Sequence, residues 1–246
     1  MALTRAELVR PHTAEGEPDA QQLLCAGMGT TPATWLRPDL AARTRFFDEQ
    51  VLTAISAGIG QIVILGAGYD DRALRFRSPG VHFYEIDHPV TQADKVRRVR
   101  TMRTNAEGLV LAPCDFRRDD IDAVLTACGH DAGSPSLFIC EGLFVYLDYP
   151  TIAGLLEALH TRGAVRSTLA ASLATHPKGM DPDRLTAVAN ARRQAGRSEP
   201  WLTILPADAH LGMLVEAGWN VQRTIDAAQL DIGVVPGRSL LVTAHS

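Results

Sequence analysis

The sequence predicts an α/β fold with a doubly wound, mostly parallel sheet of seven strands. Short apolar runs rich in β-branched residues alternate with helical patterns along the chain, as buried strands and their crossover helices do. A Gly-x-Gly turn follows the first run, Gln61–Leu65, and acidic residues end the second run about 20 positions after the first glycine. At 246 residues the chain is long enough to bury the core of one large domain.

The N-terminal part divides into a polar segment and a helix. Residues 1–20 are polar, so we expect a loose arm there, and we assign residues 1–34 to an N-terminal arm and cap. A helix is expected over residues 35–57, where apolar residues repeat at helical spacing before two glycines end it. We assign residues 35–246 to the main domain, with a cap insertion at about residues 178–205.

The remaining elements follow from the same patterns. Strands are expected at residues 61–65, 81–87, 109–114, 136–140, 168–175, 219–225 and 238–244, the last two as an antiparallel pair. Helices are expected at residues 71–76, 88–104, 121–128, 150–160, 181–198 and 206–218. The basic residues of the second of these helices indicate the charged outer face of a crossover helix rather than a phosphate site.

Charge and cysteine usage argue against several kinds of partner. The net charge of −4 offers no basic surface for nucleic acid or an anionic membrane. The four cysteines form no C-x-x-C pair and have no histidine at metal-ligand spacing, so we expect free thiols and no metal site. No apolar run is long enough to cross a bilayer, and no charged-then-apolar leader is seen. We therefore expect a soluble cytoplasmic protein with no nucleic-acid or membrane partner.

The turn after the first strand indicates a ligand that lies against bare backbone. Gly66, Ala67 and Gly68 form this turn, but Asp71 occupies the position where a dinucleotide fingerprint has its third glycine. That glycine lets a helix N-terminus approach a pyrophosphate. Its absence, beside two carboxylates, favours a cationic or neutral ligand, and S-adenosylmethionine (SAM) fits this description better than NAD.

Acidic residues end two of the predicted strands, where open α/β sheets bind their ligands. On the second strand, Asp87 has the spacing at which a carboxylate accepts hydrogen bonds from ribose hydroxyls, and Glu85 is the second candidate. On the fourth strand, Glu141 directly follows the apolar run. An acid at the end of a buried strand is rarely only solvated, so we expect Glu141 at the floor of the pocket.

Three segments of the chain carry a resemblance to a known family. They are residues 63–72, residues 84–89 with Lys95 behind them, and residues 140–147. They closely resemble the leucine carboxyl methyltransferase family, in particular a bacterial branch that includes polyketide carboxyl O-methyltransferases. The resemblance covers about residues 35–160 well and the C-terminal third loosely. It implies a class I, Rossmann-like methyltransferase fold, SAM as cofactor and S-adenosylhomocysteine (SAH) as product.

The resemblance also implies a role for Arg43, which lies in the middle of the first long helix. In the family an arginine at this point reaches the carboxylate of the methionine part of SAM. From the residues alone, Arg43 and Arg45 could instead be solvated helix charges that pair with Asp48 or Glu49.

After the third strand, Asp115 and Phe116 combine an acid with an aromatic ring. A carboxylate can accept a hydrogen bond from the exocyclic amine of adenine while the ring packs on the purine face. The alternative is that Asp115 caps the next turn and Phe116 lies in the core. The resemblance implies that both contact adenine and that Glu141 lies against the ribose and methionine part of SAM.

Two residues are candidates for a role in catalysis. Tyr146 follows the fourth strand and could orient a substrate or fill the core. His176 ends the fifth strand, where a general base could act, and the alternative is a surface histidine.

We therefore predict a SAM-dependent O-methyltransferase of secondary metabolism that converts a carboxylate of a small, polyketide-like natural product to its methyl ester. A carboxylate is already ionised at pH 7, so the enzyme needs alignment and a dry site more than a base. The alternatives are a phenol or hydroxyl O-methyltransferase, a methyltransferase for a protein C-terminus, and a SAM-binding relative with altered or no methyl transfer. The partners considered are a small-molecule substrate and a second copy in a homodimer.

Overall fold

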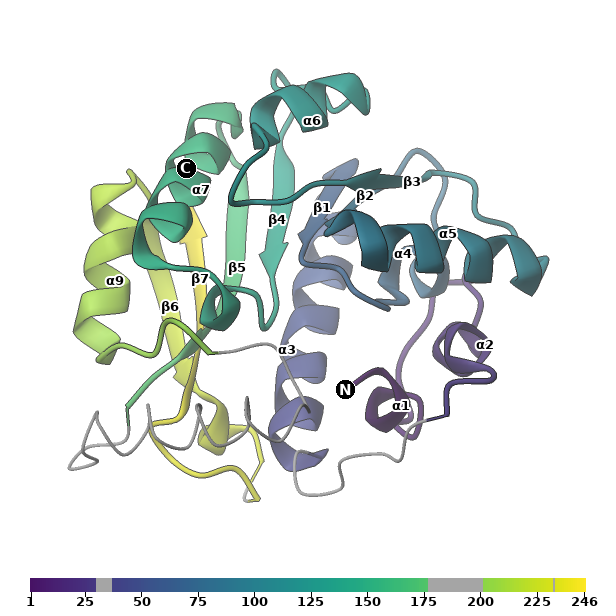
Figure 1. Cartoon of the computed structure of the whole chain (residues 1–246), viewed down its shortest axis with the longest axis horizontal. Coiled ribbons are helices and arrows are strands. Elements are labelled where there is room, and N and C mark those ends of the chain that lie inside the picture. Colours follow the sequence, from purple (N-terminus) through teal and green to yellow (C-terminus); the bar gives the residue numbers. More distant parts are fainter. Residues whose placement is uncertain (30–36, 177–200, 232) are drawn as a thin grey trace.

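The computed structural model describes residues 1–29, 37–176, 201–231 and 233–246. Its centre is an open seven-stranded sheet with the order β3-β2-β1-β4-β5-β7-β6 (Figure 1). Strands β1 to β5 run parallel, while β7 is antiparallel to both of its neighbours. The strands are β1 (Gln61–Leu65), β2 (His82–Asp87), β3 (Leu109–Pro113), β4 (Ser136–Cys140), β5 (Thr168–Ala174), β6 (Asn220–Asp226) and β7 (Ser239–His245). The predicted fold class is confirmed.

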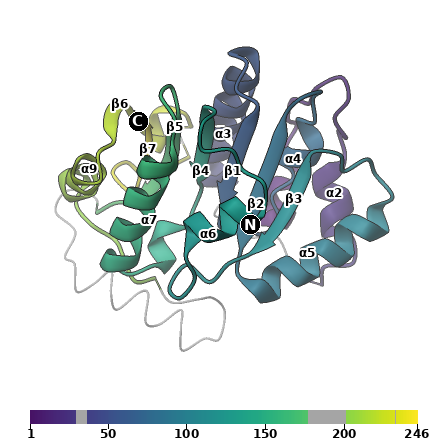
Figure 2. The same cartoon turned by 90° about the horizontal axis from the view of Figure 1, so that it is seen from above.

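Helices lie on both sides of the sheet, as the view from above shows (Figure 2). They are α1 (Ala2–Arg5), α2 (Ala20–Cys25), α3 (Arg37–Ser56), α4 (Arg72–Arg75), α5 (Pro89–Met102), α6 (Ile121–Ala127), α7 (Tyr149–Arg162) and α9 (Ala207–Glu216). Two short 3-10 helices, η2 (Phe144–Tyr146) and η3 (Ala227–Gln229), join them. One core lies between the sheet and α6, α7 and α9, and a second lies between the sheet and α3.

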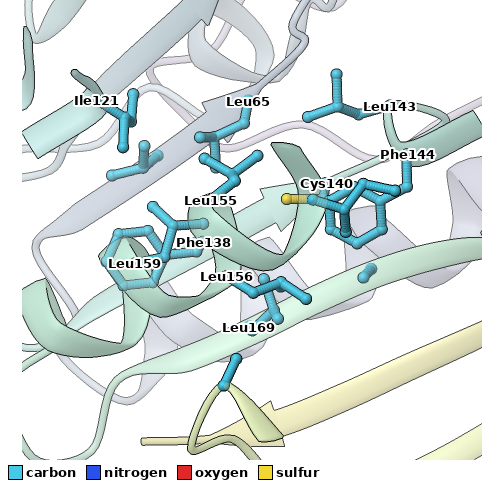
Figure 3. Packing of buried hydrophobic residues seen from close by; sticks show 14 of the residues in the cluster. Leu65, Ile121, Phe138, Cys140, Leu143, Phe144, Leu155, Leu156, Leu159 and Leu169 are labelled. Atoms are coloured by element: carbon cyan, nitrogen blue, oxygen red, sulfur yellow. The ribbon is translucent and has the colours of Figure 1, made fainter. Parts of the chain in front are cut away.

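The core beneath α7 fixes the strand ends that border the site. Leu155 and Leu159 of α7 pack with Phe138 of β4 and Leu65 of β1, and all four are buried (Figure 3). Full burial of such a side chain is worth about 1.5–3 kcal/mol. Because β1 and β4 are also paired in parallel, their carboxyl ends are held side by side.

Helix starts agree with local sequence signals. Asp148 caps α7 by accepting a hydrogen bond from Thr151 N at 3.0 Å, and a proline follows in the first turn. Asp120 caps α6 in the same way, accepting from Asp122 N at 2.9 Å. These caps place both helices directly after turns at the sheet edge.

The structure differs from the sequence-based expectations at three points. The helix expected at 71–76 is a single turn, α4, because its residues are engaged in ion pairs described below. The late antiparallel pair is present, but β7 inserts between β5 and β6. The loose arm expected at 1–20 is wrong: α1 contacts α2 and α3, and Thr13 N and Glu17 N donate to carbonyls of α4 at 3.1 and 3.0 Å.

Two expectations concern residues outside the described part of the chain. The helix predicted at 181–198 and most of the cap insertion predicted at about 178–205 fall there. Of the described helices, none has both the length and the apolar character that crossing a membrane requires.

Candidate functional site

The loop after β1 shows why two glycines stand there. Gly66 and Gly68 have φ of 67° and 51°, a conformation that other residues rarely adopt. A Cβ on Gly66 would lie 2.8 Å from Leu143 Cδ1, so close packing also requires this glycine. At Gly68 no atom lies within 4 Å of a Cβ position, which leaves the backbone open to a ligand. Ala67, between them, is buried.

Asp87 ends β2 directly beside this loop. Its Oδ2 accepts a hydrogen bond from Gly68 N at 2.6 Å, and its Oδ1 accepts from His88 N at 2.7 Å. Each carboxylate oxygen retains a further lone pair that can accept a hydroxyl. Asp87 and Gly68 thus form one unit, with an acceptor and open backbone next to each other.

Glu85, the second candidate for the ribose, is buried below the loop. Its carboxylate pairs with Lys95, whose Nζ also donates to Asp70 O at 2.7 Å. Burial raises the pKa of Glu85 to about 7, against the opposing effect of Lys95. The carboxylate therefore supports the loop from beneath.

A network of ion pairs lies between the loop, α3 and the end of β4, and we call it the arginine cluster. It consists of Arg5, Arg10, Arg43, Arg72 and Arg75 with Asp48, Asp70, Asp71 and Glu141.

Arg72 is the centre of the arginine cluster, with a side chain that is 0% exposed. It contacts Asp48 at 2.7 Å, Asp70 at 2.5 Å and Glu141 at 2.8 Å. Burial by itself raises the pKa of Glu141, but the positive charges of Arg5, Arg72 and Arg43 lower it to about 2. The pKa of Asp70 is also lowered, since Arg72, Arg5 and Lys95 outweigh its burial. Glu141 and Asp70 are therefore ionised at neutral pH.

Arg43 points from α3 to the end of β4. Its Nη2 lies 3.5 Å from Glu141 Oε1, and its Nη1 donates to Asp39 at 3.3 Å. A Cβ on Gly142, which has a φ of 66°, would lie 3.0 Å from Arg43 Nη2. The considered pairing with Asp48 does not form, because Asp48 binds Arg10 and Arg72 instead.

Two residues of the N-terminal arm complete this cluster, and sequence reasoning missed both. Arg5 on α1 donates to Glu141 at 3.1 Å and lies 3.6 Å from Asp70. Arg10 binds Asp48 with two nitrogens, at 2.8 and 2.7 Å, and Asp71 at 2.6 Å. Neither arginine lies in a periodic pattern, so the local sequence did not indicate which residues its side chain contacts.

In α1 and α3, four buried polar atoms have no hydrogen-bond partner among the described residues. They are Thr4 Oγ1, Arg5 Nε, Arg43 Nε and Thr44 Oγ1. A buried group left unpaired costs about 1–3 kcal/mol. Arg5 and Arg43 each keep a free Nε–H group, and both lie beside Glu141, whose carboxylate already has partners. Such charged donors can bind the carboxylate of an amino-acid-like ligand. The residues present therefore fit the methionine part of SAM.

Asp115 and Phe116 follow β3 at the same edge. Asp115 Oδ1 accepts from Arg117 N at 3.2 Å, so it caps a turn, and its side chain remains 26% exposed. Phe116 is half-buried and packs against the core on the α7 side. Cys114 N, just before them, donates to Asp87 O at 2.8 Å, which ties this turn to the end of β2.

Tyr146 and His176 lie beyond the ends of β4 and β5. Tyr146 is half-buried in η2, and its carbonyl accepts from Arg117 Nη2 at 2.8 Å. The Nδ1 atom of His176 is buried and has no partner among the described residues. His210 on α9, which sequence reasoning missed, hydrogen-bonds Ala174 O through Nε2 at 2.9 Å. Burial lowers the pKa of His210, and the nearby His176 adds to this effect.

Within the described ranges, no group of three or more His, Cys, Asp or Glu side chains could hold a metal ion. Burial raises the pKa of the Cys114 thiol to about 12, so this cysteine is not a reactive thiolate.

Solved structures of low sequence identity share the fold. A crystal structure from Thermobifida fusca, described as that of a "putative methyltransferase", superposes with a TM-score of 0.66, at 14% identity, over 98% of this chain and 97% of that one. Magnesium protoporphyrin IX methyltransferase from Synechocystis, solved with bound SAH, gives a TM-score of 0.59 at 12% identity over 92% and 93% of the two chains.

Relatives found by sequence comparison are more similar to this chain than these structures are. A relative from Frankia alni, named "Putative S-adenosyl-L-methionine-dependent methyltransferase", is 32% identical over 192 residues, 76% of this chain. The chain covers 64% of that relative, which is less than two thirds of its length. A relative with the same description from Mycolicibacterium vanbaalenii is 31% identical over 220 residues, 87% of this chain and 68% of the relative.

The model of one protein family, leucine carboxyl methyltransferase, matches residues 3–160. The match starts well before residue 35, so it includes the N-terminal arm that carries Arg5 and Arg10. It also contains the glycine loop, Asp87 and Glu141. The chain therefore belongs to the leucine carboxyl methyltransferase family, whose cofactor is SAM.

Proposed function

We propose that this chain is a SAM-dependent O-methyltransferase that methylates a carboxylate of a small natural product. The observation that carries the proposal is that two features occur together at this edge of the sheet. One is the Gly68–Asp87 unit, and the other is the two arginines Arg5 and Arg43, whose buried Nε atoms have no hydrogen-bond partner among the described residues. One part offers open backbone and an acceptor for ribose. The other offers charged donors for the carboxylate of methionine.

The residue roles in this proposal follow from those positions. Asp87 accepts the ribose hydroxyls, Gly68 lets the ligand lie against the backbone, and Gly66 gives the loop its turn against Leu143. Arg5 and Arg43 bind the methionine carboxylate, and they are held in place by Glu141.

Two further residues, Asp115 and Phe116, would receive adenine at the end of β3. The exposed part of the carboxylate and the half-buried ring leave both able to contact a ligand at this edge. In this proposal Glu85 does not contact SAM, because its carboxylate pairs with Lys95.

When bound, SAM supplies an electrophilic methyl group. The chain's task is to hold the cofactor and the nucleophile in line and to keep competing water away. A carboxylate substrate is ionised at neutral pH and needs no base. In this proposal Tyr146, which lies in η2 beyond the end of β4, orients such a substrate. The small-molecule substrate, the carboxyl specificity, the place in secondary metabolism and the cytoplasmic location are all parts of this proposal.

A second candidate function is methyl transfer to a phenol or another hydroxyl. The free Nδ1 of His176 at the end of β5 favours it, since a phenol must lose its proton during the reaction. His210 hydrogen-bonds Ala174 O of β5 through its own Nε2 at 2.9 Å, and nearby His176 helps to lower the pKa of His210.

Methyl transfer from SAM to matched small carboxylic acids and phenols, followed by mass spectrometry over a range of pH, tests the proposal. For an acid, we expect a methyl ester and a rate that changes little between about pH 6 and 9. His176→Ala should then have little effect, whereas on a phenol it should cost about 10²–10⁴-fold in turnover. A methyl ether product, with a pH slope that disappears in His176→Ala, would support the second candidate. SAH binding without methyl transfer to either substrate would indicate a SAM-binding relative with altered activity.

A further inference from the structure

A buried lysine connects the second strand to the glycine loop. Lys95 lies on α5 with a side chain that is 0% exposed. Its ammonium group pairs with Glu85 of β2 and donates to the carbonyl oxygen of Asp70 at 2.7 Å. Asp70 lies in the loop that follows β1, so one lysine joins a helix, a strand and this loop.

A gain in folding stability does not explain why these two charges are buried. Removal of a lysine and a glutamate from water is costly, and a buried ion pair can often be replaced by apolar side chains without loss of stability. This pair is also incompletely satisfied, because Glu85 Oε1 has no hydrogen-bond partner among the described residues. An apolar pair would fill the same space, but it could not hold the carbonyl of Asp70.

The Asp70 carbonyl is one of several points that fix the loop. At others, Gly68 N donates to Asp87 at 2.6 Å and Gly66 N donates to Ile86 O at 2.8 Å. Glu85 and Asp87 are two positions apart on β2, so their side chains leave the same face of the strand. One acid holds the loop directly, and the other holds it through Lys95.

The position of Asp70 also matters for the arginine cluster. Its Oδ1 accepts from Arg72 N at 2.8 Å, and its Oδ2 contacts Arg72 Nη1 at 2.5 Å. The same Nη1 reaches Glu141 at 2.8 Å. A shift of Asp70 would therefore move both the ribose side of the site and the side that receives the methionine carboxylate.

We infer that Glu85 and Lys95 are a positioning pair that holds the glycine loop in its binding geometry without touching the ligand. The inference rests on the proposed function, because it takes SAM as the ligand of this loop. In this inference Glu85 does not bind the ribose, as was considered from the sequence, but holds the loop through Lys95.

The variant Glu85→Leu/Lys95→Met tests the inference because it removes both charges and keeps the volume apolar. We expect a melting temperature close to that of the wild type and a dissociation constant for SAH that rises by about tenfold or more. In assays with SAM, the KM for SAM should rise while kcat changes less. In the ligand-free variant, amide hydrogen exchange in residues 66–71 should be faster than in the wild type.

Arg162→Met is the matched control, because Arg162 is also a buried cation with polar partners. It donates to His130 Nδ1 at 3.0 Å and contacts Asp122 at 2.5 Å, and within the described part of the chain its partners lie away from the glycine loop. This variant should lose stability and keep the SAH affinity of the wild type. Glu85→Gln, whose amide oxygen can still accept from Lys95, should lose less SAH affinity than the double variant.

Wild-type SAH affinity and wild-type exchange rates in the double variant would overturn the inference. So would an equal loss of affinity in Arg162→Met, because the effect would then be general destabilisation. If the double variant does not fold, hydrogen exchange in Glu85→Gln decides: faster exchange in residues 66–71 than in the wild type would support the inference, and wild-type or slower exchange would overturn it. If the wild type does not bind SAH, the proposed function fails, and hydrogen exchange in the ligand-free loop alone decides whether the pair holds it.

Discussion

At the scale of single residues, the proposed function depends on Arg5 and Arg43. Both lie on Glu141 Oε1, at 3.1 and 3.5 Å, and each keeps an unpaired Nε. One carboxylate thus orients two guanidinium groups that still have donors to offer. A second carboxylate, brought by the ligand, would complete their hydrogen bonding.

We expect Arg5→Ala and Arg43→Ala each to weaken SAH binding by about 1.5–3 kcal/mol, the range for hydrogen bonds to charged groups. Calorimetric titration should show this loss for SAH but not for 5′-methylthioadenosine, which lacks the amino acid part. Arg45→Ala is the control, because Arg45 is exposed on the same helix as Arg43 and, within the described ranges, donates to the carbonyl of Leu230 at 3.4 Å rather than to Glu141. Equal loss for both ligands would contradict a role at the methionine carboxylate.

Residues at strand ends could be predicted, and residues of the arm could not. Gly68, Asp87 and Glu141 meet at the sheet edge because parallel strands end on the same side, which follows from the strand pattern alone. Arg5 and Arg10 reach the same edge over long sequence distances through flexible side chains. Their positions depend on tertiary packing, which has no local signal.

At the scale of elements, a polar network lies where β4 begins, whereas the arginine cluster lies where β4 ends. His130 Nε2 is 2.9 Å from Ser136 Oγ at the start of β4, and its Nδ1 accepts from Arg162 of α7 at 3.0 Å. Because Nδ1 accepts, Nε2 carries the proton of a neutral ring. Burial, with the charge of Arg162, lowers the pKa of His130 to about 4.

This network predicts a loss of stability on mild acidification. The unfolded-state pKa of histidine is about 6.5, so the unfolded chain binds more protons than the folded one between about pH 4 and 6.5. Stability should fall with pH in that window by up to about 3 kcal/mol from His130. Glu85 acts in the opposite sense, since its raised folded-state pKa makes the folded chain bind more protons between its ordinary value and about 7.

Urea unfolding at pH 7 and pH 5 isolates the contribution of His130. His130→Gln should reduce the loss of stability on going to pH 5, relative to the wild type. His82→Gln, at an exposed position, should leave it unchanged. If His130→Gln loses as much stability as the wild type, the histidine is not buried in the neutral form.

The elements themselves were mostly predictable, because strand and helix patterns in this chain are regular. Two departures have physical causes. The segment after the loop forms one turn rather than a longer helix, since Asp71 and Arg72 are committed to partners in other elements. The strand order at the far edge depends on which strand pairs with β5, and β6 and β7 both carry suitable patterns.

At the scale of the whole molecule, the sheet and its two cores bring the glycine loop, Asp87 and the arginine cluster to one edge. The loop lacks the third glycine of the pyrophosphate-binding fingerprint and contains Asp70, whose lowered pKa keeps it ionised. The central claim is that this edge binds SAM and does not bind a dinucleotide.

Thermal unfolding of the wild type with SAH, and separately with NAD and NADP, tests this claim most directly. SAH should raise the melting temperature in a concentration-dependent way, by the equivalent of about 2.7 kcal/mol at a hundredfold excess over its dissociation constant. NAD and NADP should leave the melting temperature unchanged. Stabilisation by NAD or NADP without stabilisation by SAH would contradict the claim.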